Sequence, residues 1–410
     1  MAEFEFVDAP ERLAELAREF QDEKVLAVDT EADSFYHYFD KTCLVQIGTS
    51  KHSYLIDTLA FDGPEAMAPL APVFASPDVR ILFHAAEYDI YVLKRDYGYT
   101  FENVFDTMVS AQILGYPSIG LAALIEHHFG IKVPKDEQRS DWSRRPLTDK
   151  QLTYAVGDVL YLDRIHRSVE KELKKAGRLS WAQEEFDTVC KREWPDRTFD
   201  KEGYYRIKGV RKLDPKSLSV LRELFLMRDA RAREIDRPPF KVMGNRTLLD
   251  LADQKPTKPS QLKGIKGITE LLVRRMGDEL LEAINRGRDV DHPPIPKSTG
   301  NGRRRIDRKT ERRVTTLKTW RTRRSQELNL DPGVLCPNAS LEAVAWRNPE
   351  KGEDLEELPE LKGWFVREFG DEVAAVLHAD SSASKDESDA VDEPEAPKKK
   401  SAKKAAADKS

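Results

Sequence analysis

The stretch Val25-Leu26-Ala27-Val28-Asp29-Thr30-Glu31 joins an apolar run of strand length to two carboxylates. Side chains alternate between the two faces of a strand, so we expect Asp29 and Glu31 to point the same way at its carboxyl end. Neighbouring acids repel each other, and a shared proton, a basic partner or a bound cation can offset that repulsion. On this stretch alone, a solvated strand end remains an equal alternative.

Strand-like and helix-like segments alternate around this stretch. Apolar residues at helical spacing predict a helix over residues 10–20, and short strands are expected at 42–48, 53–57 and 79–83. A turn-like segment separates the strands at 42–48 and 53–57, which favours antiparallel pairing. Strands interleaved with helices predict an α/β domain with a mixed sheet.

Further polar residues fall at the ends or on the faces of predicted helices. Asp89 lies in the first turns of a helix expected to begin at His84. A capping box at 148–151 begins another helix, on which Tyr154 and Asp158, four residues apart, share a face. Asp106 ends a short strand before a helix, and we expect an N-cap there rather than a catalytic group.

A polar loop precedes the helix of Asp158. Its cations and its aromatic residue suit phosphate and base contacts, for which the candidates are Lys135, Gln138, Arg139 and Trp142. A charged loop that is merely solvated has the same composition, so this alternative stays open.

The composition excludes several classes of protein. The chain has 67 Lys+Arg against 72 Asp+Glu, and it contains no apolar run long enough to span a bilayer. Its first residues lack the order of a signal peptide, so we expect a cytoplasmic protein without a membrane partner. Three widely spaced cysteines indicate neither a disulfide framework nor a zinc site. Without a GxxxxGK[ST] loop, an ATP-driven helicase and a nucleotide cofactor are not expected.

The second half of the chain reads as helical and contains an internal repeat. The segment 245–252, which begins Asn-Arg-Thr-Leu-Leu, is echoed by 338–345, and 273–279 is echoed by 366–372. In both pairs the second segment begins 93 residues after the first, at 338 after 245 and at 366 after 273. A shared offset predicts two copies of one helical domain.

Three motifs together resemble those of the DEDDy 3'-to-5' exonucleases, and within them the ribonuclease D family. They are Asp29-Thr30-Glu31, Asp89 within His84-Ala85-Ala86-Glu87-Tyr88-Asp89, and Tyr154-Ala155-Val156-Gly157-Asp158. The segment from Arg139 to Leu147 is also similar to the family's segment before the third motif. One departure is Ala32-Asp33, which follows the first motif where many bacterial members have bulkier apolar residues. It affects the shape expected for the terminal-nucleotide pocket.

The resemblance implies a metal-dependent exoribonuclease that releases 5'-mononucleotides from RNA 3' ends, with tRNA precursors as partners. Two divalent cations, Mg²⁺ or Mn²⁺, are the implied cofactors, because carboxylates are the hard oxygen ligands they prefer. We expect Asp29 to bridge both ions, Glu31 and Asp158 to hold the ion that carries the attacking water, and Asp89 to hold the other. Tyr154, with an ordinary pKa of about 10, is expected to orient that water rather than deprotonate it.

The implied fold class is α/β plus all-α, with an RNase H-like domain whose mixed sheet is flanked by helices and two helical HRDC-type domains after it. The expected parts are an exonuclease domain at 1–195, a connector at 196–209, an HRDC domain at 210–288, a basic linker at 289–307, a second HRDC-like domain at 308–379 and a disordered charged tail at 380–410.

A basic run adjoins the second repeat. Between Arg303 and Arg324 there are eleven basic residues and two acids, an excess of +9, which predicts phosphate contacts with Arg303, Arg304 and Arg305 among the candidates. A helical bundle that only braces the exonuclease domain is the alternative. For the whole chain, a 3'-to-5' DNA exonuclease and a catalytically silent RNA-binding scaffold are the alternatives. A monomer is favoured.

Overall fold

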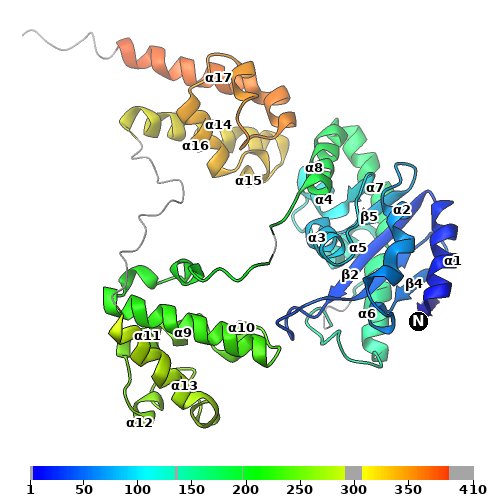
Figure 1. Ribbon diagram of the computed structural model, residues 1–410. Coiled ribbons are helices and arrows are strands. Elements are labelled where there is room, and N and C mark those ends of the chain that lie inside the picture. Colours follow the sequence, from blue (N-terminus) through cyan, green and yellow to red (C-terminus); the bar gives the residue numbers. More distant parts are fainter. Residues whose placement is uncertain (1–2, 134–136, 196, 291–306, 387–410) are drawn as a thin grey trace, which may run out of the picture. The chain divides into compact units, whose positions relative to one another are not determined.

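The computed structural model describes residues 3–133, 137–195, 197–290 and 307–386 (Figure 1). The chain divides into two compact units, residues 1–304 and 305–410. Four of the predicted substrate contacts, Lys135, Arg303, Arg304 and Arg305, fall outside the described residues.

A mixed sheet of six strands forms the centre of the first unit, in the order β1-β4-β3-β2-β5-β6. Strand β2 pairs antiparallel with β3, and β3 with β4, while β1–β4, β2–β5 and β5–β6 are parallel. The predicted mixed sheet and the antiparallel pairing are therefore confirmed. The strands span Phe4–Val7 (β1), Val25–Ala32 (β2), Thr42–Gly48 (β3), Ser53–Ile56 (β4), Arg80–Phe83 (β5) and Val104–Asp106 (β6).

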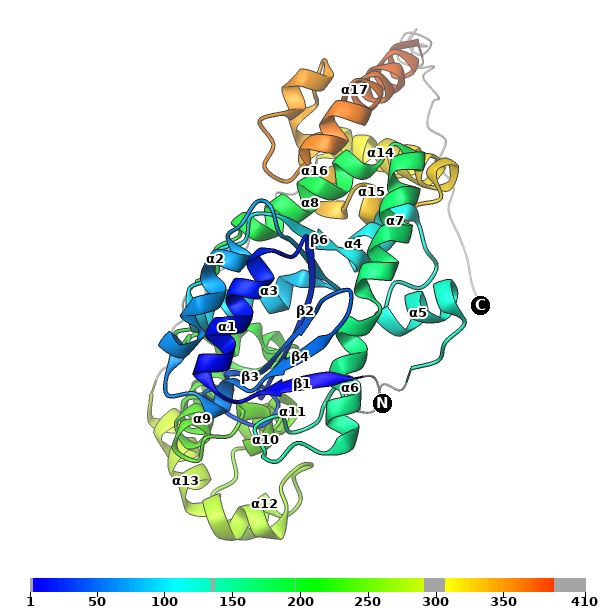
Figure 2. The ribbon, with the colours of Figure 1, turned by 90° about the vertical axis from the view of Figure 1, so that its right-hand side faces the viewer.

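Helices cover both faces of this sheet, with α1 and α2 on one side and α6 and α7 on the other in Figure 2. Sheets covered on both faces need strands that are apolar on both sides, and every residue of β3 is buried. The helices of this domain are α1 (Pro10–Gln21), α2 (Ala71–Phe74), α3 (Ala86–Tyr97), α4 (Thr107–Leu114), α5 (Leu121–Phe129), α6 (Asp149–Leu160), α7 (Leu162–Ala176) and α8 (Leu179–Lys191), with short 3-10 helices at Thr58–Ala60 and Pro64–Leu70.

The rest of the first unit is helical and has a core of its own. Leu221 and Leu224 pack there with Leu248 and Leu280, all of them fully buried. Its elements are the 3-10 helices Gly203–Arg206 and Val210–Lys212, followed by α9 (Pro215–Glu234), α10 (Pro239–Val242), α11 (Asn245–Gln254), α12 (Pro259–Leu262) and α13 (Glu270–Asp289).

The second unit repeats this helical pattern at the predicted offset. It contains α14 (Arg308–Leu328), α15 (Pro332–Leu335), α16 (Asn338–Arg347), the 3-10 helix η5 (Gly352–Leu355) and α17 (Gly363–Asp386). The elements α9 to α13 begin at 215, 239, 245, 259 and 270, and these five begin at 308, 332, 338, 352 and 363, each 93 residues later. The predicted duplication is confirmed.

One hydrogen-bond pattern is also duplicated. Arg228 donates to the Met243 carbonyl at 3.0 Å and to Oδ1 of Asn245 at 2.8 Å. Arg321 makes the same pair of bonds, to the Cys336 carbonyl at 2.6 Å and to Oδ1 of Asn338 at 3.0 Å. Each arginine ties the first long helix of its domain to the start of the third. Arg321, counted above with the basic run, therefore has a structural role.

Two boundaries differ from the sequence-based expectation. Helix α17 continues to Asp386, beyond residue 379, where the disordered tail was expected to begin. Helix α3 begins at Ala86 rather than at His84, because Ala85 adopts a left-handed conformation with φ 71°. Within the described part of the chain, the helices are too short or too polar to cross a membrane.

Candidate active site

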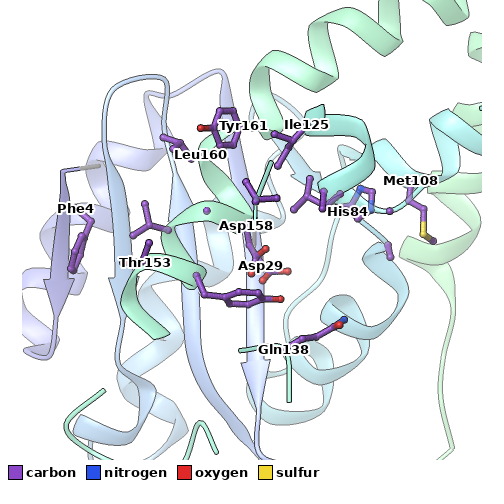
Figure 3. A pocket seen from close by; sticks show the side chains of 18 residues that line it. Phe4, Asp29, His84, Met108, Ile125, Gln138, Thr153, Asp158, Leu160 and Tyr161 are labelled. Carbon is purple, nitrogen blue, oxygen red and sulfur yellow. The ribbon is translucent and has the colours of Figure 1, made fainter. Parts of the chain in front are cut away.

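The two acids of the first motif lie inside β2, which runs past both of them to Ala32. Strand alternation places Asp29 and Glu31 on the same face, and α6 packs across β2, β3 and β4. This helix brings Asp158 to the pair, and carboxylate oxygens of all three residues lie within 4.8 Å of one another. Figure 3 shows the Asp29 and Asp158 side chains converging at the wall of a cavity.

The position of α6 follows from its start and from one glycine. Thr148 accepts from the Gln151 backbone N–H at 3.3 Å, and the Gln151 side chain accepts from the Thr148 N–H at 3.0 Å, which confirms the predicted capping box. At Gly48 a Cβ atom would stand 3.1 Å from Cβ of Val159. Glycine therefore allows α6 to approach β3 closely, and this approach sets the height of the adjacent Asp158 above the sheet.

Asp89 reaches the site from α3, and it is held by the residue between the two acids. Oγ1 of Thr30 donates to Oδ1 of Asp89 at 2.6 Å, and the Asp89 side chain is buried. Asp89 does not belong to the group of oxygens within 4.8 Å of one another. Its negative charge nevertheless raises the pKa of both Glu31 and Asp158, so it adjoins the cluster. Three carboxylates from β2 and α6 thus converge here, and Asp89 from α3 adjoins them.

Asp106 holds the start of α3, a role that the sequence did not reveal. Its Oδ1 accepts from the backbone N–H groups of Met108 and Val109 at 2.8 and 3.1 Å, which confirms the predicted N-cap of α4. The same carboxylate also accepts from Ala85 N at 3.1 Å and from Ala86 N at 2.8 Å. A single buried carboxylate therefore joins the first turns of two helices, one of which carries Asp89.

Burial and mutual repulsion make these acids hard to ionise. Burial, and next to it the charge of Asp158, raises the pKa of Asp29 well above its usual range. Burial followed by the charge of Asp29 does the same to the pKa of Glu31. The pKa of Asp158 rises to about 7, mainly by burial and further by the charge of Asp89. Oδ2 of Asp158 is buried without a hydrogen-bond partner among the described residues. A bound divalent cation would offset both the repulsion between these acids and the cost of their burial.

A cavity of about 500 Å³ opens beside the cluster. Its polar wall includes Asp29, Asp158, Tyr154 and Gln138, and its apolar wall includes Met108 and Ile125 (Figure 3). Burial raises the pKa of Tyr154, and the charge of Asp158 raises it further, so the hydroxyl keeps its proton at neutral pH. The cavity therefore combines acidic oxygens and a phenol with an apolar surface large enough for a nucleobase.

His84 adds a neutral ring to the same wall. Burial lowers the pKa of His84 to about 4, so the imidazole is uncharged at pH 7. Nδ1 lies 2.9 Å from Oγ1 of Thr107, which itself donates to the Phe83 carbonyl at 3.1 Å. Because the Thr107 proton is used in that bond, Nδ1 is the donor and Nε2 is left as an acceptor.

The remaining predicted contacts have different positions. Gln138 lines the cavity, and the Arg139 side chain is exposed. Trp142 is only 1% exposed and packs in the core, with its ring centroid 6.1 Å from that of Tyr154. A buried ring offers no face to a base, so the predicted base contact is not available to Trp142. Its ring supports Tyr154 instead.

The departure at Ala32-Asp33 shapes the loop after β2. Asp33 is fully buried, and its Oδ1 accepts from the Lys41 backbone N–H at 2.8 Å, which closes the loop from Asp33 to Lys41. Tyr36 in this loop donates to the Arg139 carbonyl at 2.9 Å. Asp33 thus organises the loop that follows β2, and Tyr36 connects this loop to the segment of Gln138 and Arg139.

In the second unit, helix α14 carries exposed cations. Arg313, Arg321, Arg323 and Arg324 are bound to carbonyl, amide or carboxylate groups. No partner among the described residues is found for four exposed side chains, which are those of Arg308, Lys309, Arg312 and Lys318. These four, rather than the whole basic run, are available in the described chain for an anionic partner.

Comparison with known proteins agrees with this geometry. Residues 4–174 match the 3'-5' exonuclease family, and residues 217–284 and 310–377 each match the HRDC domain. Among solved structures, the catalytic core of RRP6 from Trypanosoma brucei is 30% identical with a TM-score of 0.63, covering 70% of this chain and 80% of that one. Ribonuclease D from Escherichia coli shares the fold at 23% identity, with a TM-score of 0.66 over 92% of this chain and 99% of that one.

Two curated relatives match nearly the whole length. Ribonuclease D from Pseudomonas paraeruginosa is 31% identical over 391 residues, which are 92% of this chain and 100% of that protein. Ribonuclease D from Granulibacter bethesdensis is 30% identical over 376 residues, 90% of this chain and 91% of that protein. With its exonuclease domain, its two HRDC domains and these full-length relatives, the chain belongs to the ribonuclease D family of 3'-to-5' exoribonucleases.

Proposed function

We propose that Asp29, Glu31, Asp89 and Asp158 hold two divalent cations, Mg²⁺ or Mn²⁺, and that the cavity beside them receives the 3' end of an RNA. The observation that carries this proposal is the convergence of three half-buried carboxylates, with oxygens within 4.8 Å of one another. Such a cluster costs stability in the metal-free protein, because each charge is desolvated and repelled. Hard oxygen donors in this arrangement suit both ions.

The ions, when bound, supply positive charge for the attacking and leaving oxygens of a phosphodiester. The chain's own residues do the rest. In this proposal Asp29 would contact both cations, while Glu31 and Asp158 would hold one of them and Asp89 would hold the other. Thr30 fixes the Asp89 carboxylate through its 2.6 Å hydrogen bond. The protonated Tyr154 hydroxyl orients the attacking water, because its raised pKa excludes proton abstraction at neutral pH.

The lining of the cavity supports the proposal that the terminal nucleotide of an RNA binds there. Its apolar wall at Met108 and Ile125 suits the face of a base, and Gln138 with Nε2 of His84 offers polar atoms to its edge or to the sugar. Hydrolysis at this position releases a 5'-mononucleotide and exposes the next 3' end. We propose tRNA precursors as the physiological RNA. In support, the Escherichia coli relative is described as an exoribonuclease involved in structured RNA processing.

The helical domains serve to bind the body of the RNA in this proposal. The exposed cations of α14 match a phosphate backbone, and they support guidance rather than bracing.

The decisive experiment is 3'-end trimming of a labelled RNA with Mg²⁺ or Mn²⁺, repeated with EDTA. We expect Asp29→Asn to lower the trimming rate by at least about 100-fold, because one buried charge that contacts both cations is lost. Asp22→Asn, an exposed acid of the same domain, is the matched control and should trim normally. Equal trimming by Asp29→Asn, or trimming in EDTA, would refute the proposed mechanism. A DNA oligonucleotide of the same sequence tests the alternative of a DNA exonuclease.

A further inference from the structure

Gln46 lies next to Asp29 on the strand that pairs with β2. In the antiparallel register of β2 and β3, Gln46 stands directly opposite Asp29, and on its other side it stands opposite Leu55 of β4. Residues directly opposite each other point to the same face of a sheet. That face lies under α6, because a Cβ atom at Gly48, two residues along β3, would meet Val159. Gln46 is therefore enclosed between the sheet and the helix that carries Asp158.

The side-chain amide of Gln46 has no partner. The residue is 0% exposed, and neither Oε1 nor Nε2 makes a hydrogen bond within the described chain. A buried polar group left unpaired costs about 1 to 3 kcal/mol. The positions that flank it on this face, Leu44 and Leu55, are apolar and fully buried. A leucine or methionine at position 46 would pack in the same place without this cost, so the fold alone does not account for a glutamine.

Of the two described residues directly opposite Gln46, which are Asp29 and Leu55, Asp29 is the acidic one. Opposed Cβ atoms in an antiparallel pair are about 4.5 to 5.5 Å apart. The glutamine side chain carries its amide three bonds beyond Cβ, so Nε2 can reach a carboxylate oxygen of Asp29 by a change of rotamer. No displacement of the backbone is needed.

We propose that Gln46 is a positioning residue, whose Nε2–H donates to the ionised Asp29 carboxylate and holds it in the orientation that binds cations. This inference rests on the proposed function, since it gives Asp29 a fixed geometry toward two cations. Oxygen ligands that are oriented by a second hydrogen bond lose less entropy when a metal binds. The glutamine then serves metal binding, although its unpaired amide lowers the stability of the metal-free fold.

The test compares Gln46→Met and Gln46→Leu with Leu44→Met, a control on the same face of the same strand. Mn²⁺ affinity is measured by calorimetry on the full chain without RNA, and unfolding is followed in EDTA. We expect both Gln46 variants to be at least as stable as the parent in EDTA and to bind Mn²⁺ about 10-fold more weakly or worse. The Leu44→Met control should keep the parent's affinity.

Three results are distinguishable. Unchanged Mn²⁺ affinity in a folded Gln46 variant would overturn the inference, and the proposed function would stand. Lower stability of both Gln46 variants in EDTA would also overturn it, because the amide would then serve the fold. Absence of Mn²⁺ binding by the parent chain would contradict the proposed function itself.

Discussion

Replacing Asp106 should affect stability and activity together, because one carboxylate caps both α3 and α4. In Asp106→Asn, Oδ1 still accepts from Ala85, Met108 and Val109, but an NH₂ group replaces the oxygen that accepts from Ala86 at 2.8 Å. One charge-assisted hydrogen bond, about 1.5 to 3 kcal/mol, is lost, and two donors then face each other in a buried position. We expect a loss of about 3 kcal/mol.

We expect the substitution to lower activity because it changes the backbone at the start of α3. Ala85 adopts a left-handed conformation that costs a non-glycine residue about 1 to 2 kcal/mol, and its N–H is held by Asp106. When this restraint weakens, the first turn of α3, which includes Asp89, is free to relax. We therefore expect a lower kcat for RNA trimming with little change in the affinity for RNA.

The assay is thermal unfolding in EDTA followed by single-turnover trimming. A loss of about 3 kcal/mol corresponds to a fall in Tm of about 6 to 12 °C for a domain of this size. Thr148→Ala removes an ordinary helix cap and serves as the control, with a loss of about 1 kcal/mol. A Tm for Asp106→Asn no lower than that of Thr148→Ala would refute this reasoning.

Two further predictions concern the charge of the molecule. The pKa of Asp158 is raised to about 7 in the folded protein. Between about pH 4 and 7 the folded chain therefore holds a proton that the unfolded chain has released. The stability of the metal-free protein falls as the pH rises through this range. Asp158→Asn should therefore raise Tm in EDTA at pH 8 and abolish most of the stabilisation by Mn²⁺; a lower Tm would contradict the sign. Reversing the charges of Arg308, Lys309 and Arg312 to Glu should weaken binding to structured RNA and flatten its salt dependence, while cleavage of short oligonucleotides is spared. An equal reversal at Lys171, Lys175 and Lys191 controls for net charge, and identical losses in both variants would remove the case for α14.

Local sequence patterns determined the elements and the identity of the acids. The apolar run before Asp29, the capping box at 148–151 and the offset of 93 residues each depend on residues that are close in the chain or on simple repetition. The class of the sheet, the duplicated helical domain and the elements that carry Asp29, Asp89 and Asp158 could therefore be predicted. The resemblance to a known family then linked three weak motifs that are far apart in the chain.

Only the tertiary structure decided which side chains share an environment. The loop residue Trp142 is buried against Tyr154 because the segment folds over the core, whereas the sequence shows only an aromatic among charges. Asp106 caps a second helix that lies 20 residues earlier in the chain. Gln46 stands opposite Asp29 because of the strand register. Strand register and packing bring together residues that are distant in sequence, and these contacts cannot be predicted from a local sequence pattern. The pair of acids in β2 could be read from the chain, but their neighbours depended on the sheet.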